Sequence, residues 1–265
     1  MVNEFPVEPY NNSTILKPNN LPFKFYYGMS AWGRTEWIGK LYPEGTKEAN
    51  FLHFYVQHFN SIELHATHYK IPATERIKNW ADKAEGRDFI FCPKVPQSIS
   101  HYSSFVNIEE RSNAFINSIR AFDKHLGPVY MKVSEKFTPK RKEGLYNYLK
   151  TLPNDLQVFL EVTHSDWFEE DEFENFLFFL RKNNIGLIIL DHPERPIRLD
   201  LTIPKCYIRF IPTGERKRVK SWFDKIQDWK QKGLKEAYFF VQPETNPVHA
   251  LADAQYFQEL NNEQN

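Results

Sequence analysis

Eight short apolar runs recur along this chain, and most of them end in a charged or polar residue on the same face as the run. Stretches with helical spacing lie between most of these runs. Alternation of strands and helices predicts a parallel sheet, and eight repeats predict an α/β fold of the closed (β/α)8 type, a TIM barrel. The predicted strands are Phe23–Ser30, Phe59–His65, Phe89–Lys94, Val129–Ser134, Val158–Thr163, Leu187–Asp191, Cys206–Ile211 and Tyr238–Gln242. The predicted helices are Glu48–His58, Thr74–Ala84, Ile108–His125, Lys140–Thr151, Glu169–Lys182, Val219–Lys232 and Ala250–Leu260.

Two segments depart from this regular pattern. The connection between the sixth and seventh strands, residues 192–205, contains Pro193, Pro196 and Pro204. Proline removes a backbone donor and clashes inside a helix, so we expect an irregular sixth crossover. Residues 1–22 are polar and rich in proline, and they predict an irregular N-terminal arm that either covers the N-terminal face of the barrel or is mobile. The remaining residues, 23–265, are predicted to form one TIM-barrel domain.

Composition narrows the classes of function. The chain has 34 basic and 34 acidic side chains, so the molecule as a whole has no net charge to attract nucleic acid or an anionic membrane. No apolar run approaches the length of a membrane span, and the first residues lack the basic start and apolar centre of a signal peptide. Cys92 and Cys206 fall in the third and seventh predicted strands, which are not neighbours in a barrel. We therefore expect no disulfide, no membrane contact and a cytoplasmic location.

Side-chain parity places charges in the mouth of the predicted barrel. In the second strand Ile62 and Leu64 are expected to face the helices, which turns Ser61, Glu63 and His65 toward the barrel axis. In this fold, the C-terminal ends of the strands form the active-site face. The same alternation predicts that three acids and three bases share this enclosed space: Glu63, Glu161, Asp191, Lys94, Lys132 and Arg209.

Such a balanced set of charges has two interpretations. Burying an unpaired charge costs several kcal/mol or more, so the six residues could form a structural ion-pair network that closes the top of the barrel. Alternatively they form a ligand-binding or catalytic site, which is where this fold regularly places its chemistry. The second interpretation is favoured, and the first stays open.

Several short stretches form an ordered set along the chain. They include Gly28-Met29-Ser30-Ala31-Trp32, Tyr42-Pro43-Glu44-Gly45, Phe59-Asn60-Ser61-Ile62-Glu63, Ile99-Ser100-His101, Leu126-Gly127-Pro128, Glu161, Asp191 and Tyr207-Ile208-Arg209. Through this set the chain resembles the YecE-like family of TIM barrels, a domain-of-unknown-function family, from about residue 23 to the C-terminus. The resemblance implies the barrel fold, but the family provides no settled reaction to transfer. The chain departs from the family pattern at four places: Thr163 (usually an arginine), Lys132 (usually a glutamine), Phe210-Ile211-Pro212 (usually Leu-His-Gly) and Gln242-Pro243 (usually an asparagine pair).

The favoured function is an enzyme that acts on a small anionic molecule, such as a phosphorylated or carboxylated sugar-like compound. Glu63 and Glu161 are predicted to act as general acid and base, with Asp191 orienting a base or a substrate hydroxyl. Lys94 and Arg209 are predicted to hold the anion, because guanidinium groups bind phosphate and carboxylate in a bidentate manner. Lys94 could instead form a Schiff base if an apolar pocket lowered its pKa. The predicted substrate-binding set is completed by Lys132, Trp32, His101 and Gln242.

Three further functions remain as alternatives. Four histidines lie near strand ends beside the acids, as in metal-dependent sugar isomerases and abasic-site endonucleases, but the tight metal-binding motifs are missing and three interior cations would repel a metal. We therefore expect neither a metal nor another cofactor. The basic run 214–220 after the seventh strand suggests a phosphate-binding turn or a nucleic-acid partner, against which the neutral net charge counts. A non-catalytic ligand-binding barrel is the third alternative.

Overall fold

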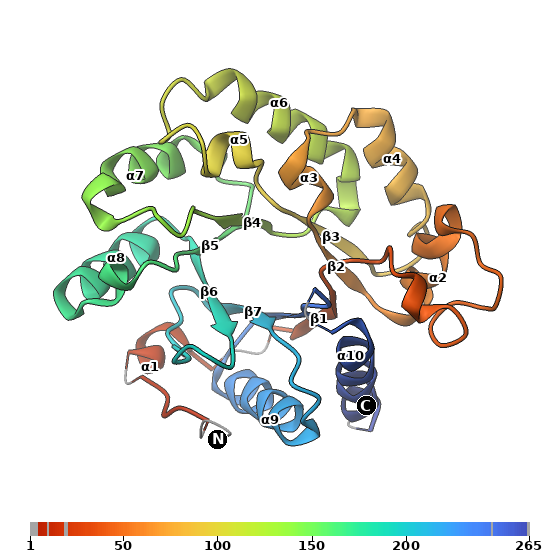
Figure 1. The fold of residues 1–265 in the computed structure, drawn as a ribbon. Coiled ribbons are helices and arrows are strands. Elements are labelled where there is room, and N and C mark those ends of the chain that lie inside the picture. Colours follow the sequence, from red (N-terminus) through yellow and green to blue (C-terminus); the bar gives the residue numbers. More distant parts are fainter. Residues whose placement is uncertain (1–4, 10, 19–20, 245, 264–265) are drawn as a thin grey trace.

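A computed structural model confirms the predicted (β/α)8 fold (Figure 1). The structure describes residues 5–9, 11–18, 21–244 and 246–263. Eight parallel strands form the wall of a nearly closed barrel, and helices surround it. The strands are β1 Lys24–Met29, β2 Ser61–Leu64, β3 Ile90–Pro93, β4 Val129–Lys132, β5 Val158–Glu161, β6 Gly186–Asp191, β7 Lys205–Phe210 and β8 Glu236–Val241.

The strands pair in the order β3-β2-β1-β8-β7-β6-β5-β4. Between β3 and β4 only isolated bridges join the wall, at Phe91 with Leu126 and at Lys94 with Tyr130. Two backbone hydrogen bonds support this seam, from Gly127 to the Phe91 carbonyl and from Val95 to the Tyr130 carbonyl, each 2.8 Å long. The seam brings Lys94 and Tyr130 side by side at the C-terminal ends of their strands.

The helices agree with the sequence pattern except at their ends and in the mouth-side loops. The Ile108–His125 prediction corresponds to α6 followed by a 3-10 segment, Arg120–His125, in which Asp123 leaves helical geometry. Two single-turn helices, α3 and α5, lie in loops after β2 and β3. No helix among the described residues is both long enough and apolar enough to cross a membrane. The helices are α1 Asn12–Ile15, α2 Phe51–His58, α3 Ala66–Tyr69, α4 Thr74–Asp82, α5 Gln97–Ser100, α6 Glu109–Ile119, α7 Lys142–Thr151, α8 Glu170–Lys182, α9 Arg216–Lys232 and α10 Pro247–Asn262.

Aromatic side chains fill the interior of the barrel. Alternate residues of each strand face the helices and join the large outer core, while the others form a separate inner cluster. Tyrosine suits this position because its ring fills apolar space and its hydroxyl can reach a polar group. The inner cluster thus links an apolar interior to a polar mouth, and its aromatic members are Tyr26, Tyr130, Phe159, Tyr207, Tyr238 and Phe240.

The sixth crossover contains no helix, as the three prolines predict. The N-terminal arm lies beside this crossover, and its helix α1 stands between α8 and α9 in the ring of helices (Figure 1). Asn12 is 1% exposed; its amide donates to the Leu199 carbonyl at 2.7 Å and its side-chain oxygen accepts from the Leu201 amide at 2.8 Å. Phe5 packs edge-on against Trp222 of α9. The described part of the arm around Phe5 and Asn12 therefore covers the wall where a sixth helix would lie.

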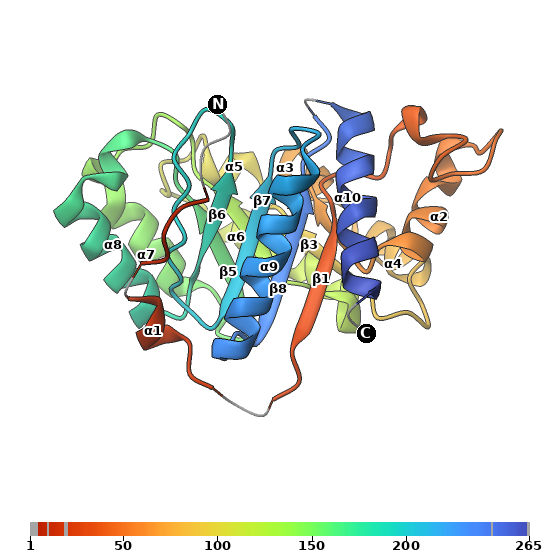
Figure 2. The same ribbon diagram turned by 90° about the horizontal axis from the view of Figure 1, so that it is seen from below.

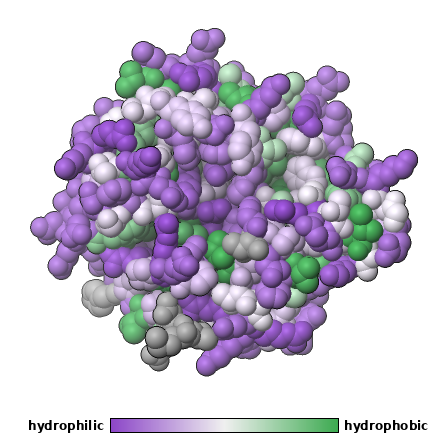
Figure 3. Space-filling view, viewed as in Figure 1, coloured by the Kyte–Doolittle hydropathy of each residue, from purple (hydrophilic) through white to green (hydrophobic). Residues whose placement is uncertain are grey.

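The C-terminal ends of the strands point upward in Figure 2, toward the loops that carry α3 and α5. The same end faces the reader in Figure 3, where hydrophilic residues gather around the centre of the face. The C-terminal ends of the strands therefore form a polar mouth, and the N-terminal ends of the strands lie at the opposite face of the barrel.

Asn12→Ala tests whether the arm contributes to the stability of the barrel. The substitution leaves a carbonyl and an amide of the crossover buried without partners, and we expect the free energy of unfolding to fall by about 2 kcal/mol or more. Urea denaturation measures this change. Thr14→Ala is the control, since the Thr14 hydroxyl bonds only within the exposed arm. Equal midpoints for the two variants would show that the arm does not support the wall.

Candidate functional site

Five of the six charged residues predicted to face inward do so and meet at the mouth: Glu63, Lys94, Lys132, Glu161 and Arg209. They come from β2, the end of β3, β4, β5 and β7. Glu63 and Glu161 are 0% and 1% exposed, so both carboxylates are removed from water. Buried carboxylates of this kind require partners that compensate the loss of hydration.

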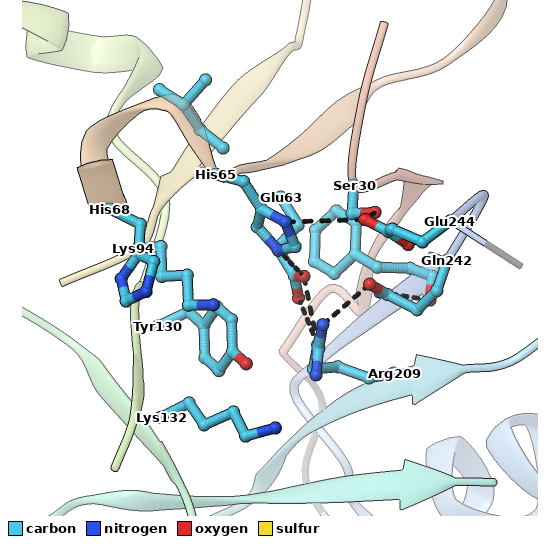
Figure 4. Close-up of polar contacts among 12 residues, drawn as sticks. Ser30, Glu63, His65, His68, Lys94, Tyr130, Lys132, Arg209, Gln242 and Glu244 are labelled. Carbon is cyan, nitrogen blue, oxygen red and sulfur yellow. Dashed lines mark hydrogen bonds and ion pairs between the residues drawn. The ribbon is translucent and has the colours of Figure 1, made fainter. Parts of the chain in front are cut away.

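Arg209 supplies the compensation for both buried acids. Its Nε lies 3.1 Å from each oxygen of Glu63, and its NH1 lies 2.8 Å from Glu161 Oε2. Its NH2 donates to Gln242 Oε1 at 2.8 Å (Figure 4). Because each guanidinium nitrogen already has a partner within the protein, Arg209 joins the two acids rather than presenting a free fork to an anion.

Glu63 also binds a histidine. His65 Nε2 lies 2.6 Å from Glu63 Oε1, and the Tyr207 hydroxyl donates to Glu63 Oε2 at 2.9 Å. Burial opposes ionisation of Glu63, but the Arg209 charge and the bonds from His65 and Tyr207 outweigh it and lower its pKa to about 2. Glu63 is therefore an anion at neutral pH and accepts the hydrogen bond from His65 Nε2.

Glu161 has a less complete set of partners. Tyr130 donates to its Oε2 at 3.1 Å, whereas Lys132 Nζ lies 3.5 Å from its Oε1 and 3.3 Å from Glu135 Oε1. Burial opposes its ionisation, but Arg209 and Lys132 outweigh this and lower the pKa of Glu161. Its Oε1 is buried and accepts no hydrogen bond from the described residues.

Lys94 lies against a ring instead of an acid. Its Nζ is 5.2 Å from the centre of the Tyr130 ring, and the guanidinium carbon of Arg209 is 4.8 Å from the same ring. The centre of the His65 ring lies 6.2 Å from the centre of the Tyr130 ring. Burial and the like charge of Arg209, partly offset by Glu63 and Glu161, lower the pKa of Lys94 to about 8. The side chains of Lys94, Arg209 and His65 thus all lie around the Tyr130 ring.

The expectation that Asp191 faces the mouth was wrong. Its carboxylate accepts from Arg218 Nε at 2.8 Å and from Trp222 Nε1 at 2.6 Å, both on α9 outside the barrel. In β6 the even-numbered Ile188 belongs to the inner cluster, while Leu187 and Ile189 belong to the outer core. Asp191 ties α9 to the barrel wall, so it cannot orient a base or a substrate hydroxyl in the mouth.

The predicted substrate-binding residues other than the lysines lie at different depths. Gln242 is buried in the mouth and bonded to Arg209. His101 ends α5, where its Nδ1 lies 2.8 Å from Ser100 Oγ and its ring is 5.0 Å from that of His68. Burial and the charges of Lys94 and Lys132 lower its pKa. Trp32, in the loop after β1, packs edge-on against Trp80 of α4, with ring centres 5.6 Å apart.

Sequence reasoning left several residues that complete the site without a catalytic or binding role. His65 was predicted to face the barrel axis and was considered only as a metal ligand. Tyr130 shares the parity of Lys132, so its inward direction followed from the same argument. Ser30 donates to Glu244 Oε1 at 2.9 Å, and this oxygen lies 3.6 Å from His65 Nδ1 (Figure 4). Glu244 belongs to the loop after β8, where strand alternation gives no direction.

The other candidate sites of the sequence have local partners. Among the described residues, no group of three or more His, Cys, Asp or Glu is arranged to hold a metal ion. In the basic run, Arg218 is buried against Asp191, Lys220 pairs with Asp224 at 2.6 Å, and Arg216 stacks on Tyr256 at 4.8 Å. Arg218 thus anchors α9 to the barrel wall, while Arg216, Lys217 and Lys220 lie on the surface.

Comparison with known proteins agrees with the fold. The family model described as "Protein of unknown function DUF72" matches residues 26–265. The UPF0759 protein YecE of Escherichia coli (strain K12) is 25% identical over 231 residues, which cover 78% of this chain and 82% of YecE.

Solved structures show the same barrel. DUF72 family proteins from Enterococcus faecalis V583 and Thermotoga maritima MSB8 both align with a TM-score of 0.76. The first is 20% identical and covers 90% of this chain and 95% of its own; the second is 24% identical and covers 89% and 98%. D-psicose 3-epimerase from Clostridium cellulolyticum H10 shares the general fold at a TM-score of 0.50 and 12% identity, over 89% of this chain and 97% of its own. Since the family model spans nearly the whole chain, this protein belongs to the DUF72 family.

Proposed function

We propose that this protein is an enzyme that transfers a proton on a small anionic, hydroxylated molecule bound in the mouth of the barrel. One observation carries the proposal. Arg209 pairs with both buried carboxylates, and Lys94 lies beside the Tyr130 ring without an ion pair among the described residues. The mouth therefore contains a lysine, Lys94, that has no ion pair with a described residue, and a histidine, His65, that is hydrogen-bonded to Glu63.

Charge balance favours an anion in this space. The inward cations are Arg209, Lys94 and Lys132, and the buried anions are Glu63 and Glu161, so three positive charges face two negative ones. Glu135 shares Lys132, but its side chain is 65% exposed and its charge is screened by water. A phosphate or carboxylate near Lys94 and Lys132 would balance the remaining charge in a partly dehydrated site, where the effective dielectric is lower than in water.

The anion in this proposal lies near Lys94 and Lys132. Sequence reasoning assigned anion binding to Lys94 and Arg209, but the nitrogens of Arg209 bind Glu63, Glu161 and Gln242. Lysine ammonium groups bind phosphate as mobile point charges, and the Lys94 Nζ lies 5.2 Å from the centre of the Tyr130 ring with no ion pair to a described residue. Arg209 serves the site by keeping both acids ionised and fixed.

His65 is the group best suited to transfer a proton. The pKa of Glu63 is about 2, so Glu63 holds no proton near neutrality, and burial within the same network keeps Tyr130 protonated because its pKa is raised well above 10. Glu63 instead accepts from His65 Nε2, which leaves Nδ1 toward the more exposed Glu244. A carboxylate bonded to one ring nitrogen sets the tautomer and prepares the other nitrogen as a base.

Lys94→Met tests the anion site. In the wild-type protein a phosphorylated or carboxylated metabolite at about ten times its Kd adds about 1.4 kcal/mol to the free energy of unfolding and raises the melting temperature by about 3–5 °C. We expect Lys94→Met to remove most of this rise in a thermal scan of such compounds, because it deletes the cation that lacks an acid. Lys136→Met, an exposed lysine in the loop after β4, is the matched control and keeps the full rise. A ligand-induced rise that survives Lys94→Met would place the anion elsewhere.

His65→Gln tests proton transfer. When the protein is incubated in D2O with the compounds that stabilise it, we expect a carbon-bound proton of the substrate to exchange for deuterium, observed by NMR. His65→Gln should slow this exchange by about 10²-fold or more, the usual contribution of a positioned acid–base group. Exchange at the same rate in the variant would remove His65 from this role. A compound that stabilises the protein but never exchanges would favour the non-catalytic ligand-binding alternative.

Lys132→Met tests the electrostatic origin of the Lys94 pKa, which is about 8. Lys132 carries a like charge that lowers this pKa, so its removal should raise the pH at which half of Lys94 is deprotonated. Competitive acetylation followed by mass spectrometry measures that midpoint residue by residue. Glu161→Gln should shift the midpoint in the opposite direction, since Glu161 raises the Lys94 pKa. The same direction of shift in both variants would contradict this account of the mouth.

A further inference from the structure

A cavity of about 500 Å³ opens beside the mouth, between the C-terminal ends of β5 and β6. Its volume falls within the range of small-molecule sites. Glu161 is common to the cavity and to the Arg209 network, so the two spaces adjoin. Of the residues that line this cavity, only Glu161 was predicted from the sequence to take part in the site.

The cavity exists because the barrel wall splits there. The β5–β6 ladder consists of Phe159 with Gly186 and Leu160 with Leu187, and it extends no further toward the mouth. Beyond this point β5 stays paired with β4 up to Glu161, and β6 stays paired with β7 from Ile188 to Asp191. Each strand follows its other neighbour, so their C-terminal ends separate and the irregular sixth crossover crosses the opening.

The wall of the cavity is mostly apolar but contains two polar atoms without hydrogen-bond partners. Leu187, Ile188, Leu190 and Phe168 supply apolar surface. Glu161 Oε1 and Thr163 Oγ1 belong to lining residues, and both are buried without a hydrogen bond to any described residue. Such atoms are rare in native interiors, and a ligand hydroxyl is one group that would satisfy them.

Two arginines of the crossover form the outer rim. The Arg198 guanidinium lies 4.2 Å from the Phe173 ring centre and 5.9 Å from that of Phe168, and no carboxylate of the described residues forms an ion pair with it. Arg195 lies 3.8 Å from Glu135 at the side of the mouth. A guanidinium plane stacked on aromatic rings extends the apolar wall while remaining polar at its edge, which suits a flat ring at the entrance.

We propose that the substrate of the mouth carries an apolar body, aromatic or branched, which occupies this cavity with a hydroxyl near Glu161 and Thr163. The inference rests on the proposed anion site at Lys94 and Lys132 for the position of the charged end. Lys132 Nζ lies 3.5 Å from Glu161 Oε1, so the anionic end and the apolar body meet at Glu161. The substrate class is therefore an amphipathic anion rather than a simple sugar phosphate.

Three probes separate the two parts of this site in calorimetric titrations: inorganic phosphate for the mouth, 1-naphthol for the cavity and 1-naphthyl phosphate for both. We expect 1-naphthyl phosphate to bind about tenfold more tightly than inorganic phosphate, because the cavity removes part of the ring from water. Leu190→Trp fills the cavity and should reduce the ester to the affinity of phosphate. Thr163→Leu fills it from the other strand and should act in the same direction. Phe178→Trp, on the exposed face of α8, is the control and should change nothing.

The outcomes distinguish the cavity from the mouth. Equal affinities of phosphate and its naphthyl ester in the wild-type protein would overturn the cavity proposal and leave the anion site in place. An advantage of the ester that survives both filling variants would also overturn it. Binding of 1-naphthol without phosphate binding would instead defeat the proposed anion site, with Leu190→Trp then deciding whether the naphthol occupies the cavity. Melting curves of each variant establish that it is folded.

Discussion

Two carboxylates share the interior of one barrel, and Arg209 is what makes this possible. Glu63 and Glu161 come from strands on different sides of the mouth and have almost no contact with water. Removing one partner from a buried ion pair typically costs about 3–5 kcal/mol, because the charge that remains is uncompensated. Here a single guanidinium serves both acids; Tyr207 and Tyr130 donate to them, and Gln242 accepts from Arg209. The positions of Glu63, Glu161 and Gln242 therefore depend on this cation.

The pairing of Arg209 with both acids also distinguishes the charged groups that bind one another within the protein from those that a ligand could contact. Arg209 is used within the protein, and Glu63 stays ionised because of it. What remains exposed to the mouth is a histidine oriented by Glu63 and two lysines, of which Lys94 lies over an aromatic ring. In the proposed function the ion-pair network and the functional site, which sequence reasoning treated as alternatives, are two parts of one arrangement. The network fixes both acids, and the acids raise the pKa of Lys94 against the effect of its burial.

Sequence alone was sufficient where polar residues interrupt a strand and set its phase. Ser61, Glu63 and His65 alternate with Ile62 and Leu64, so the inward direction of Glu63 followed directly. Strand β6 gave no such phase, since its residues before Asp191 are apolar on both faces, and the direction assigned to Asp191 was wrong. A strand buried on both sides is expected to read as a continuous apolar run, so its faces differ only through what packs on them. The hydrogen-bond partners of Arg209 could not be predicted from the alternation of residues either, because they lie on other strands and their distances depend on the register between strands.

The sixth crossover connects the two irregular features of the wall. A helix after β6 would normally cover the outer side of β6 and β7, and the proline-rich segment cannot form one. The arm takes this place through Asn12 and Phe5, and Asp191 turns outward to bind Arg218 and Trp222 of α9. With its outer side covered in this way, β6 pairs with β7 up to its last residue and leaves β5 early. The outward Asp191, the arm and the cavity all adjoin the crossover that lacks this helix. A segment that appears in the sequence only as an interruption thus determines the shape of the space beside the charged mouth.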